Sequence, residues 1–121
     1  MYKIFFYREK DGTEPVKQYM LGLAEKTDKD SRIKLNKIRD YIKLLRERGV
    51  AIGAPYVKHI EGDLWELRPL KERIFFAVWH GDGFILIHHF VKKTKKTPRR
   101  EIKKAKDKLI EFRKRSEDDE T

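Results

Sequence analysis

The chain has 121 residues, the size of one ordinary domain, so we expect a single domain over residues 1–121. Apolar side chains make up 39% of the sequence, enough for a real core, and charged side chains make up 41%. The absence of cysteine excludes disulfides, thiolate catalysis and cysteine-based zinc sites. No segment resembles a signal peptide or reaches the length of a membrane span, so we expect a cytoplasmic protein that does not bind a membrane.

The charge of the chain is strongly basic. There are 30 Lys and Arg against 20 Asp and Glu, a net charge of +10, although residues 116–121 contain four of the acids. The rest of the chain is therefore more basic than the whole. This charge favours a nucleic acid or an acidic protein as the partner, and we expect residues 116–121 to form a solvated acidic tail.

A short strand and a helix are predicted first. Residues 2–7, YKIFFY, are typical of a strand, and the Asp-Gly pair at residues 11–12 predicts the turn that closes it. A helix then begins near Pro15, with Thr13 as its cap. Its apolar residues follow helical spacing on one face: Val16, Tyr19, Met20 and Leu23.

A second, longer helix is predicted over residues 30–48. Gly49 supplies the left-handed conformation that commonly ends a helix. Its predicted buried face consists of Ile33, Leu35, Ile38, Tyr41, Ile42 and Leu45.

An antiparallel meander is predicted next, because short apolar runs alternate with spacers of hairpin length. The runs are residues 56–60, 64–70, 73–80 and 84–91. In the second run, alternation puts Leu64, Glu66 and Arg68 on one face, which is polar, and Trp65 and Leu67 on the other.

Residues 92–108 form a basic block directly after the last predicted strand, with ten Lys or Arg against two acids. A third helix is predicted from Pro98 to Lys114, with Thr97 as its N-cap and a basic outer face. Its apolar stripe consists of Ile102, Ala105, Leu109 and Phe112.

The predicted hairpin brings Arg68 opposite Arg73, with Glu66 two residues away on the same face. Two guanidinium groups on one sheet face make an anion site. The alternative is an exposed cross-strand salt bridge, worth under about 1 kcal/mol. Lys92 and Lys93 follow the last strand, so one of their side chains points to the face that carries Arg73. The alternative is a solvated run of charges, which is less favoured because the end of a strand holds its side chains rigidly.

Lys58 and Lys96 could join this patch, and Tyr56, after a proline loop, could stack on a base. The histidines lack metal-ligand spacing, so we expect no metal, although Glu61, Asp63 and Glu66 leave a less favoured metal-nuclease alternative. His88 and His89 are adjacent and point to opposite faces of their strand. One of them could transfer a proton in phosphodiester cleavage, although a core histidine is the commoner role.

Three segments in order, LWELRPL, RIFFAVWH and ILIHHFVKKTKKTPRREIKKAKDK, resemble the phage-derived Gp49-like, or HigB-like, branch of the RelE/ParE toxin superfamily. The resemblance extends over nearly the entire chain. It implies an α+β fold with an N-terminal strand, a two-helix hairpin, an antiparallel meander and a basic C-terminal helix. The helices would cover one face of the sheet, and the other would be concave and basic.

The activity implied by this resemblance is that of a type II toxin–antitoxin system. The toxin would cleave mRNA in the A site of the 70S ribosome without a metal or cofactor, and a HigA-like helix-turn-helix antitoxin would restrain it. By position, the resemblance implies catalytic roles for Arg73, Arg68, Lys92, Lys93 and Glu66, and we add His89 to this set as a candidate for proton transfer. The wider RNA-binding set would be Lys58, His59, Lys95, Lys96, Arg99, Arg100 and Tyr56.

Two alternatives remain open at this point. The ParE branch of the same superfamily inhibits DNA gyrase without catalysis, and fold alone does not separate it from the nucleases. The chain could also be a module that binds single-stranded nucleic acid along its basic helix. Several relatives have a tyrosine after the last strand, and this chain lacks it. The identity of the general acid is therefore also open, with His88 or His89 as candidates.

Overall fold

Five strands among the described residues form one mixed β-sheet. The computed structural model describes residues 1–120 and the side chains of residues 1–118. The strands lie in the spatial order β1 (Lys3–Phe6), β5 (Gly83–Val91), β4 (Glu72–Trp79), β3 (Leu64–Leu67) and β2 (Val57–Glu61). As predicted, β2 to β5 pair as an antiparallel meander, whereas β1 runs parallel to β5 and makes the sheet mixed.

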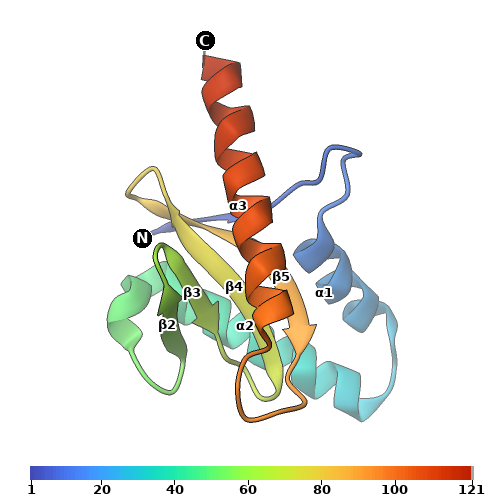
Figure 1. Cartoon of the computed structure of the whole chain (residues 1–121). Coiled ribbons are helices and arrows are strands. Elements are labelled where there is room, and N and C mark those ends of the chain that lie inside the picture. The colour runs from blue at the N-terminus through green and yellow to red at the C-terminus, as the bar shows by residue number, and fades with distance from the viewer. Residues whose placement is uncertain (121) are drawn as a thin grey trace.

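Two helices, α1 (Pro15–Glu25) and α2 (Lys29–Arg48), cover one face of the sheet (Figure 1). The α2 helix begins where the Asp28 side chain accepts a hydrogen bond from the Ser31 backbone N–H. It ends at Gly49, whose φ of 67° confirms the predicted left-handed stop, and a short 3-10 turn, η1 (Gly49–Ile52), follows. The core on this face includes Val16, Leu23, Leu35, Ile38, Ile42, Leu45, Leu67, Ile74 and Phe76.

Two details of the predicted helices are wrong. Ile33 is 42% exposed, because it lies off the stripe that Leu35, Ile38 and Ile42 present to the sheet. Thr13 does not cap α1, because its hydroxyl bonds to the Asp11 carboxylate and holds the preceding turn instead.

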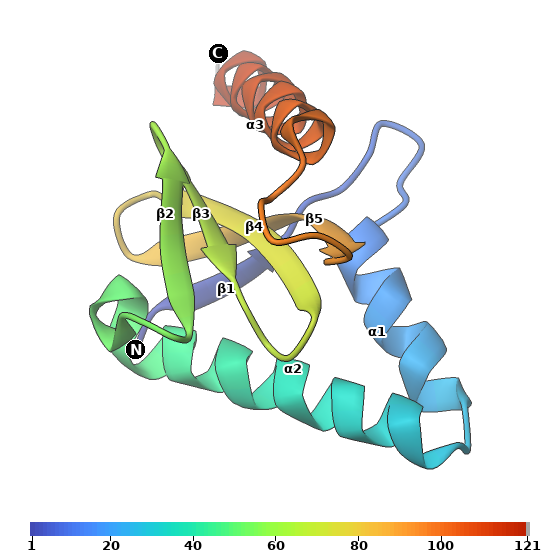
Figure 2. The ribbon, with the colours of Figure 1, turned by 60° about the horizontal axis from the view of Figure 1, so that its bottom comes forward.

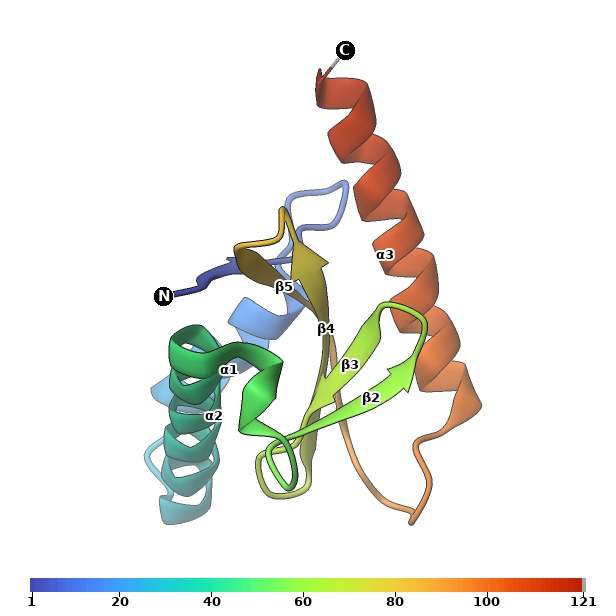
Figure 3. The same cartoon turned by 90° about the vertical axis from the view of Figure 1, so that its left-hand side faces the viewer.

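The third helix, α3 (Arg99–Glu120), packs on the opposite face of the sheet, so the sheet lies between two helical layers (Figures 2 and 3). This corrects the expectation of an open concave face. The predicted apolar stripe of this helix is confirmed, and it explains the position of the helix, because the stripe packs on apolar side chains of β3, β4 and β5. The second core consists of Tyr7, Leu64, Phe75, Ala77, Ile85, Ile87, Ile102, Ala105 and Leu109.

The α3 helix also extends beyond its predicted end. It starts one residue after Pro98 and continues to Glu120, so most of the predicted acidic tail is helical, while residue 121 lies outside the described residues. No Gly or Pro follows Lys114 to stop the helix, and ion pairs of Arg113 with Asp63 and of Arg115 with Glu111 hold this stretch. None of the helices in the described part of the chain is long and apolar enough to cross a bilayer.

A buried polar cluster ties α1 to the sheet. The Tyr19 hydroxyl donates to the Glu72 carboxylate, and the His89 ring stacks on Tyr19 at 3.7 Å between centroids. Burial raises the pKa of Tyr19, and the bond to Glu72 raises it further. Burial alone would raise the pKa of Glu72, but His89 and Tyr19 outweigh it and lower that pKa. The Glu72 carboxylate is therefore held as an anion on the α1 face of β4.

Replacing Tyr19 by Phe is expected to lower the free energy of unfolding by about 1–3 kcal/mol, because the buried Glu72 carboxylate loses a donor. Tyr2→Phe is the matched control, since the Tyr2 hydroxyl makes no hydrogen bond within the described residues. Chemical denaturation of the three proteins measures the difference. Equal effects of the two substitutions would contradict the role given to the Tyr19 hydroxyl.

Candidate functional site

The carboxylate of Glu66 is the centre of the candidate site. Glu66 is 1% exposed and lies on the face of β3 that α3 covers. Its Oε1 is 3.3 Å from Arg68 Nε and 3.6 Å from Arg73 Nε. The predicted convergence of these three side chains is therefore correct, but the cluster is buried, which excludes the alternative of an exposed salt bridge of small energetic value.

The guanidinium of Arg73 is fixed by the turn that precedes it. Its Nη1 donates to the backbone carbonyls of Leu70 and Glu72, each at 2.8 Å, and Arg73 is 7% exposed. Leu70 has a φ of 57°, an uncommon conformation for a residue with a side chain, and this turns the chain so that its carbonyl faces Arg73. Burial lowers the pKa of Arg73, and the charge of Glu66 opposes this effect.

Lys92 adds a further positive charge beside the two arginines. Its backbone N–H donates to the Lys71 carbonyl at 2.8 Å, which fixes the end of β5 next to the β3–β4 turn. Burial lowers the pKa of Lys92, and the charges of Arg73 and Arg68 lower it further. Lys58 lies opposite Glu66 on β2 and also acts electrostatically on Lys92. Four cations thus surround one carboxylate in the described structure, leaving a net positive charge that suits an anion.

The outer basic residues lie along the segment of residues 92–98 and the start of α3. Lys93, Lys96, Arg99 and Arg100 line a hollow there, with Phe90 and Val91 as apolar neighbours. Arg99 also pairs with Glu61 at 2.6 Å, while Lys95 is exposed. The chain segment that lines this hollow follows Lys92 directly and connects β5 to α3 (Figure 1).

Three of the predicted site residues lie elsewhere. His89 pairs with Ile74 across the strands and therefore faces α1, on the opposite side of the sheet from Arg73. His59 faces the Trp65 ring on that same side, and its Nε2 is 2.7 Å from the Gly62 carbonyl. The Tyr56 ring packs edge-on against Tyr41 of α2 and is half-buried. The period-2 alternation of a strand separates the two histidines from the cations, whereas Tyr56 lies before β2 and its ring is held by packing on α2.

His88 shares the Arg73 face but is already engaged. Its Nε2 lies 2.9 Å from Glu101 Oε2, and its Nδ1 lies 3.1 Å from Lys108 Nζ. Burial lowers the pKa of His88, and the Lys108 charge lowers it further, although Glu101 opposes both. His88 therefore helps to seat α3 on β5.

The carboxylates of the predicted metal-nuclease alternative are separated by their cationic partners. Glu61 binds Lys106 and Arg99, each at 2.6 Å, and hydrogen bonds from these two residues lower the pKa of Glu61. Asp63 pairs with Arg113 at 3.0 Å. Among the described residues, no group of three or more His, Asp and Glu side chains could hold a metal ion.

Thr97 is the site residue that sequence reasoning missed. Its hydroxyl donates to Glu66 Oε2 at 2.9 Å, whereas the pattern predicted that it would cap α3. Local sequence gives no signal for this contact, because a Thr before Pro can bond either its own helix or a distant acceptor. The two partners are 31 positions apart in the sequence, and only the fold brings them together.

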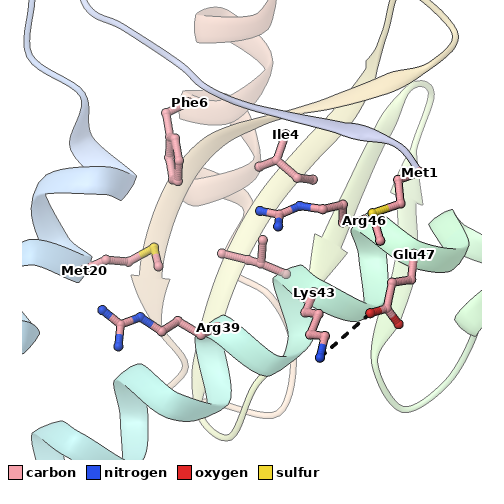
Figure 4. Close-up of a pocket in the computed structure, with 9 residues that line it drawn as sticks. Met1, Ile4, Phe6, Met20, Arg39, Lys43, Arg46 and Glu47 are labelled. Carbon is pink, nitrogen blue, oxygen red and sulfur yellow. Dashed lines mark ion pairs between the residues drawn. The ribbon is translucent and has the colours of Figure 1, made fainter.

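A second hollow lies on the other face of the sheet, between β1, α1 and α2 (Figure 4). Ile4, Phe6 and Met20 supply its apolar surface, and Arg39 and Arg46 lie at its edge. No carboxylate is buried beside these arginines in the described structure, so nothing there fixes a guanidinium as Glu66 does. The candidate site is therefore the cluster at Glu66.

Stability is expected to fall as the pH falls from about 7.5 to 5.5. Because the pKa of His88 is lowered in the folded state, the unfolded chain binds more protons near the ordinary histidine pKa of about 6.5. This contribution is complete above that pH and is lost below it, by at most about 1.4 kcal/mol per pH unit. The lowered pKa values of Glu72 and Glu101 act in the same direction at lower pH.

Chemical denaturation across this pH range measures the dependence in the unmodified protein and in His88→Gln, where it should be smaller. His80→Asn is the control, because His80 is exposed on the β4–β5 hairpin. An unchanged pH dependence in His88→Gln would contradict this assignment.

One comparison places the cluster within a known family. The family model described as "Phage derived protein Gp49-like (DUF891)" matches residues 25–110, from the end of α1 to within α3. The match contains every residue of the Glu66 cluster, while β1 and most of α1 lie outside it. No curated protein matches the chain. The chain belongs to the phage-derived Gp49-like family, a RelE-type family of toxin-like proteins.

Proposed function

We propose that this single-domain protein is a HigB-like toxin of a type II toxin–antitoxin system and cleaves mRNA on the ribosome. The observation that carries the proposal is the convergence of Arg68, Arg73, Lys92 and Lys58 around the buried Glu66 carboxylate. Cleavage of RNA needs such a site, because its transition state carries extra negative charge on the phosphate oxygens. Preorganised cations stabilise that charge more than they stabilise the ground state.

RNA supplies its own nucleophile. The 2′-hydroxyl attacks the adjacent phosphorus, the bond to the 5′-oxygen breaks, and the products carry a cyclic phosphate and a 5′-hydroxyl. Arg68 and Arg73 would bind the phosphate oxygens with fixed donors, while Glu66 beneath them orients both guanidinium groups. This chemistry needs no metal ion or cofactor.

Lys92 is the proposed proton-transfer group. Burial and the charges of Arg73 and Arg68 lower the pKa of Lys92, so its ammonium group gives up a proton more readily than an ordinary lysine does. It would donate that proton to the departing 5′-oxygen, while the 2′-hydroxyl proton passes to solvent. His89, one of the candidates for this step, lies on the other face of the sheet from Arg73 and does not reach the cluster. Glu66 is also a poor proton acceptor here, since it is buried and both oxygens have partners.

The outer cations would bind the flanking RNA and the ribosome. Lys93, Lys96, Arg99 and Arg100 line the hollow next to the cluster, and Lys95 is exposed on the same segment. Positive charges along such a path bind a phosphate backbone without reading its sequence. The ribosomal substrate, mRNA in the A site of the 70S particle, also sets the proposed location in the cytoplasm.

Toxins of this kind are restrained by an antitoxin, and we place a HigA-like helix-turn-helix protein in that role. The net charge of +10 favours an antitoxin with an acidic surface.

Arg73→Ala is expected to reduce mRNA cleavage about a hundredfold or more, because a fixed donor to the transition state is lost. The measurements are growth arrest on induction and cleavage of ribosome-bound message with purified protein, with and without a chelator. Thermal unfolding of the variant is recorded alongside. Arg39→Ala is the matched control, since Arg39 lies at the edge of the hollow on the other face.

Full growth arrest and full cleavage by folded Arg73→Ala would overturn the proposed site. Cleavage that stops with chelator would indicate a metal nuclease instead. Arrest with DNA damage and intact mRNA would indicate the gyrase-inhibitor alternative, and RNA binding without cleavage would indicate a binding module.

Lys95→Gln is expected to weaken binding of single-stranded RNA and to lower the slope of log affinity against log salt by about 0.7, the value for one phosphate contact. The cleavage rate of bound message should stay the same. Fluorescence anisotropy at several salt concentrations measures the slope. Lys17→Gln is the control, because Lys17 is exposed on α1. An unchanged slope would remove Lys95 from the RNA path.

A further inference from the structure

The hydrogen bonding of Glu66 is unequal between its two oxygens. Neither Arg68 Nε nor Arg73 Nε has a hydrogen-bond partner, so both attract Oε1 only by charge, at 3.3 and 3.6 Å. The bond from Thr97 Oγ1 to Oε2, at 2.9 Å, is the one directional hydrogen bond to this carboxylate in the described structure. Thr97 therefore restrains the orientation of the Glu66 carboxylate, which the two arginines do not restrain.

The motion in question is rotation of the Glu66 carboxylate about χ3, the last torsion of its side chain. Such a bond between an sp³ and an sp² carbon has a broad energy minimum, so charge attraction alone restrains it weakly. A hydrogen bond to Oε2 sets the angle, and Oε1 then stays between the two arginines. The angle matters because the carbonyls of Leu70 and Glu72 hold Arg73 in place, and the shared Oε1 then sets the position of Arg68 relative to it.

Thr97 is itself held from both sides. Before it, the backbone N–H of Lys92 bonds to the Lys71 carbonyl at 2.8 Å, which fixes the start of the segment. After it, Arg99 and Lys106 of α3 both bind Glu61 in β2, each at 2.6 Å. The docking of α3 on the sheet (Figure 3) therefore restrains the segment that carries Thr97.

We infer that Thr97 is a positioning residue of this site, acting on Arg68 and Arg73 through Glu66. This role rests on the proposed RNA cleavage and adds to it a link between α3 and the phosphate-binding arginines. The Thr97 hydroxyl contacts Glu66 and acts on the arginines only through it. Its loss should therefore change the rate at which bound RNA is cleaved and not the affinity for RNA.

The test compares Thr97→Val, which keeps the shape of the side chain but removes the donor, with Thr97→Ser, which keeps the donor. Thr13→Val is the matched control, because the Thr13 hydroxyl also donates to a carboxylate, that of Asp11, but lies outside the proposed site. The substrate is a defined mRNA on 70S ribosomes. The maximal cleavage rate, the concentration of ribosome complex at half-maximal rate and the thermal unfolding midpoint are measured for each protein.

Thr97→Val should lower the maximal rate about tenfold to a hundredfold, while the half-maximal concentration changes less than about twofold. Thr97→Ser should restore the rate to within about threefold of the unmodified protein, and Thr13→Val should have the rate of the unmodified protein. If Thr97→Val does not fold, Thr97→Ala takes its place in the same comparison.

An unmodified rate in folded Thr97→Val would overturn the role of Thr97 and leave the nuclease proposal intact. Equal loss in Thr97→Val and Thr97→Ser would also overturn it, because packing and not the hydroxyl would then be responsible. A raised half-maximal concentration with an unchanged maximal rate would replace it with a direct RNA contact. If the unmodified protein does not cleave ribosome-bound message, the proposed function fails and the role of Thr97 fails with it.

Discussion

The buried carboxylate of Glu66 is the constraint on which the rest of this structure depends. A charge with 1% exposure is costly unless cations and hydrogen bonds replace its water. Here Arg68, Arg73 and Thr97 do so, from the end of β3, the start of β4 and the segment before α3. Removing one partner from such a buried pair typically costs about 3–5 kcal/mol. The same contacts therefore stabilise the meeting of three chain segments and build the anion site.

The position of α3 determines how much of the sheet is available for binding. Its apolar stripe covers the middle of the second face, so the basic surface is not a broad concave sheet but the cluster at one sheet end. In the proposed function, this cluster would bind a single phosphate group of the RNA. The basic outer face of α3 then offers charge along the flanking backbone, where affinity matters more than geometry.

The two faces of the sheet divide the ionisable residues into separate groups. Glu72, Tyr19 and His89 form the cluster on the α1 face. Glu72 and His89 are the sequence neighbours of Arg73 and His88, which lie on the opposite face. The Glu72 carbonyl nevertheless receives a bond from Arg73, so the buried cluster supports the arginine from behind. Its rigidity is a condition for the preorganised electrostatics that a nuclease without a metal requires.

The sequence alone was sufficient for most of the fold, because the signals are local. Strand alternation, helical spacing and Gly49 predicted the meander and the two-helix hairpin, and strand spacing also paired Glu66 with Arg68 and Arg73. The length of α3 and its place on the second face depended on packing against β3 to β5. Only the tertiary structure decided that His89 faces away, that Lys92 lies beside the arginines and that Thr97 holds Glu66. Those contacts join residues far apart in the chain, and local sequence patterns do not determine which distant residues meet.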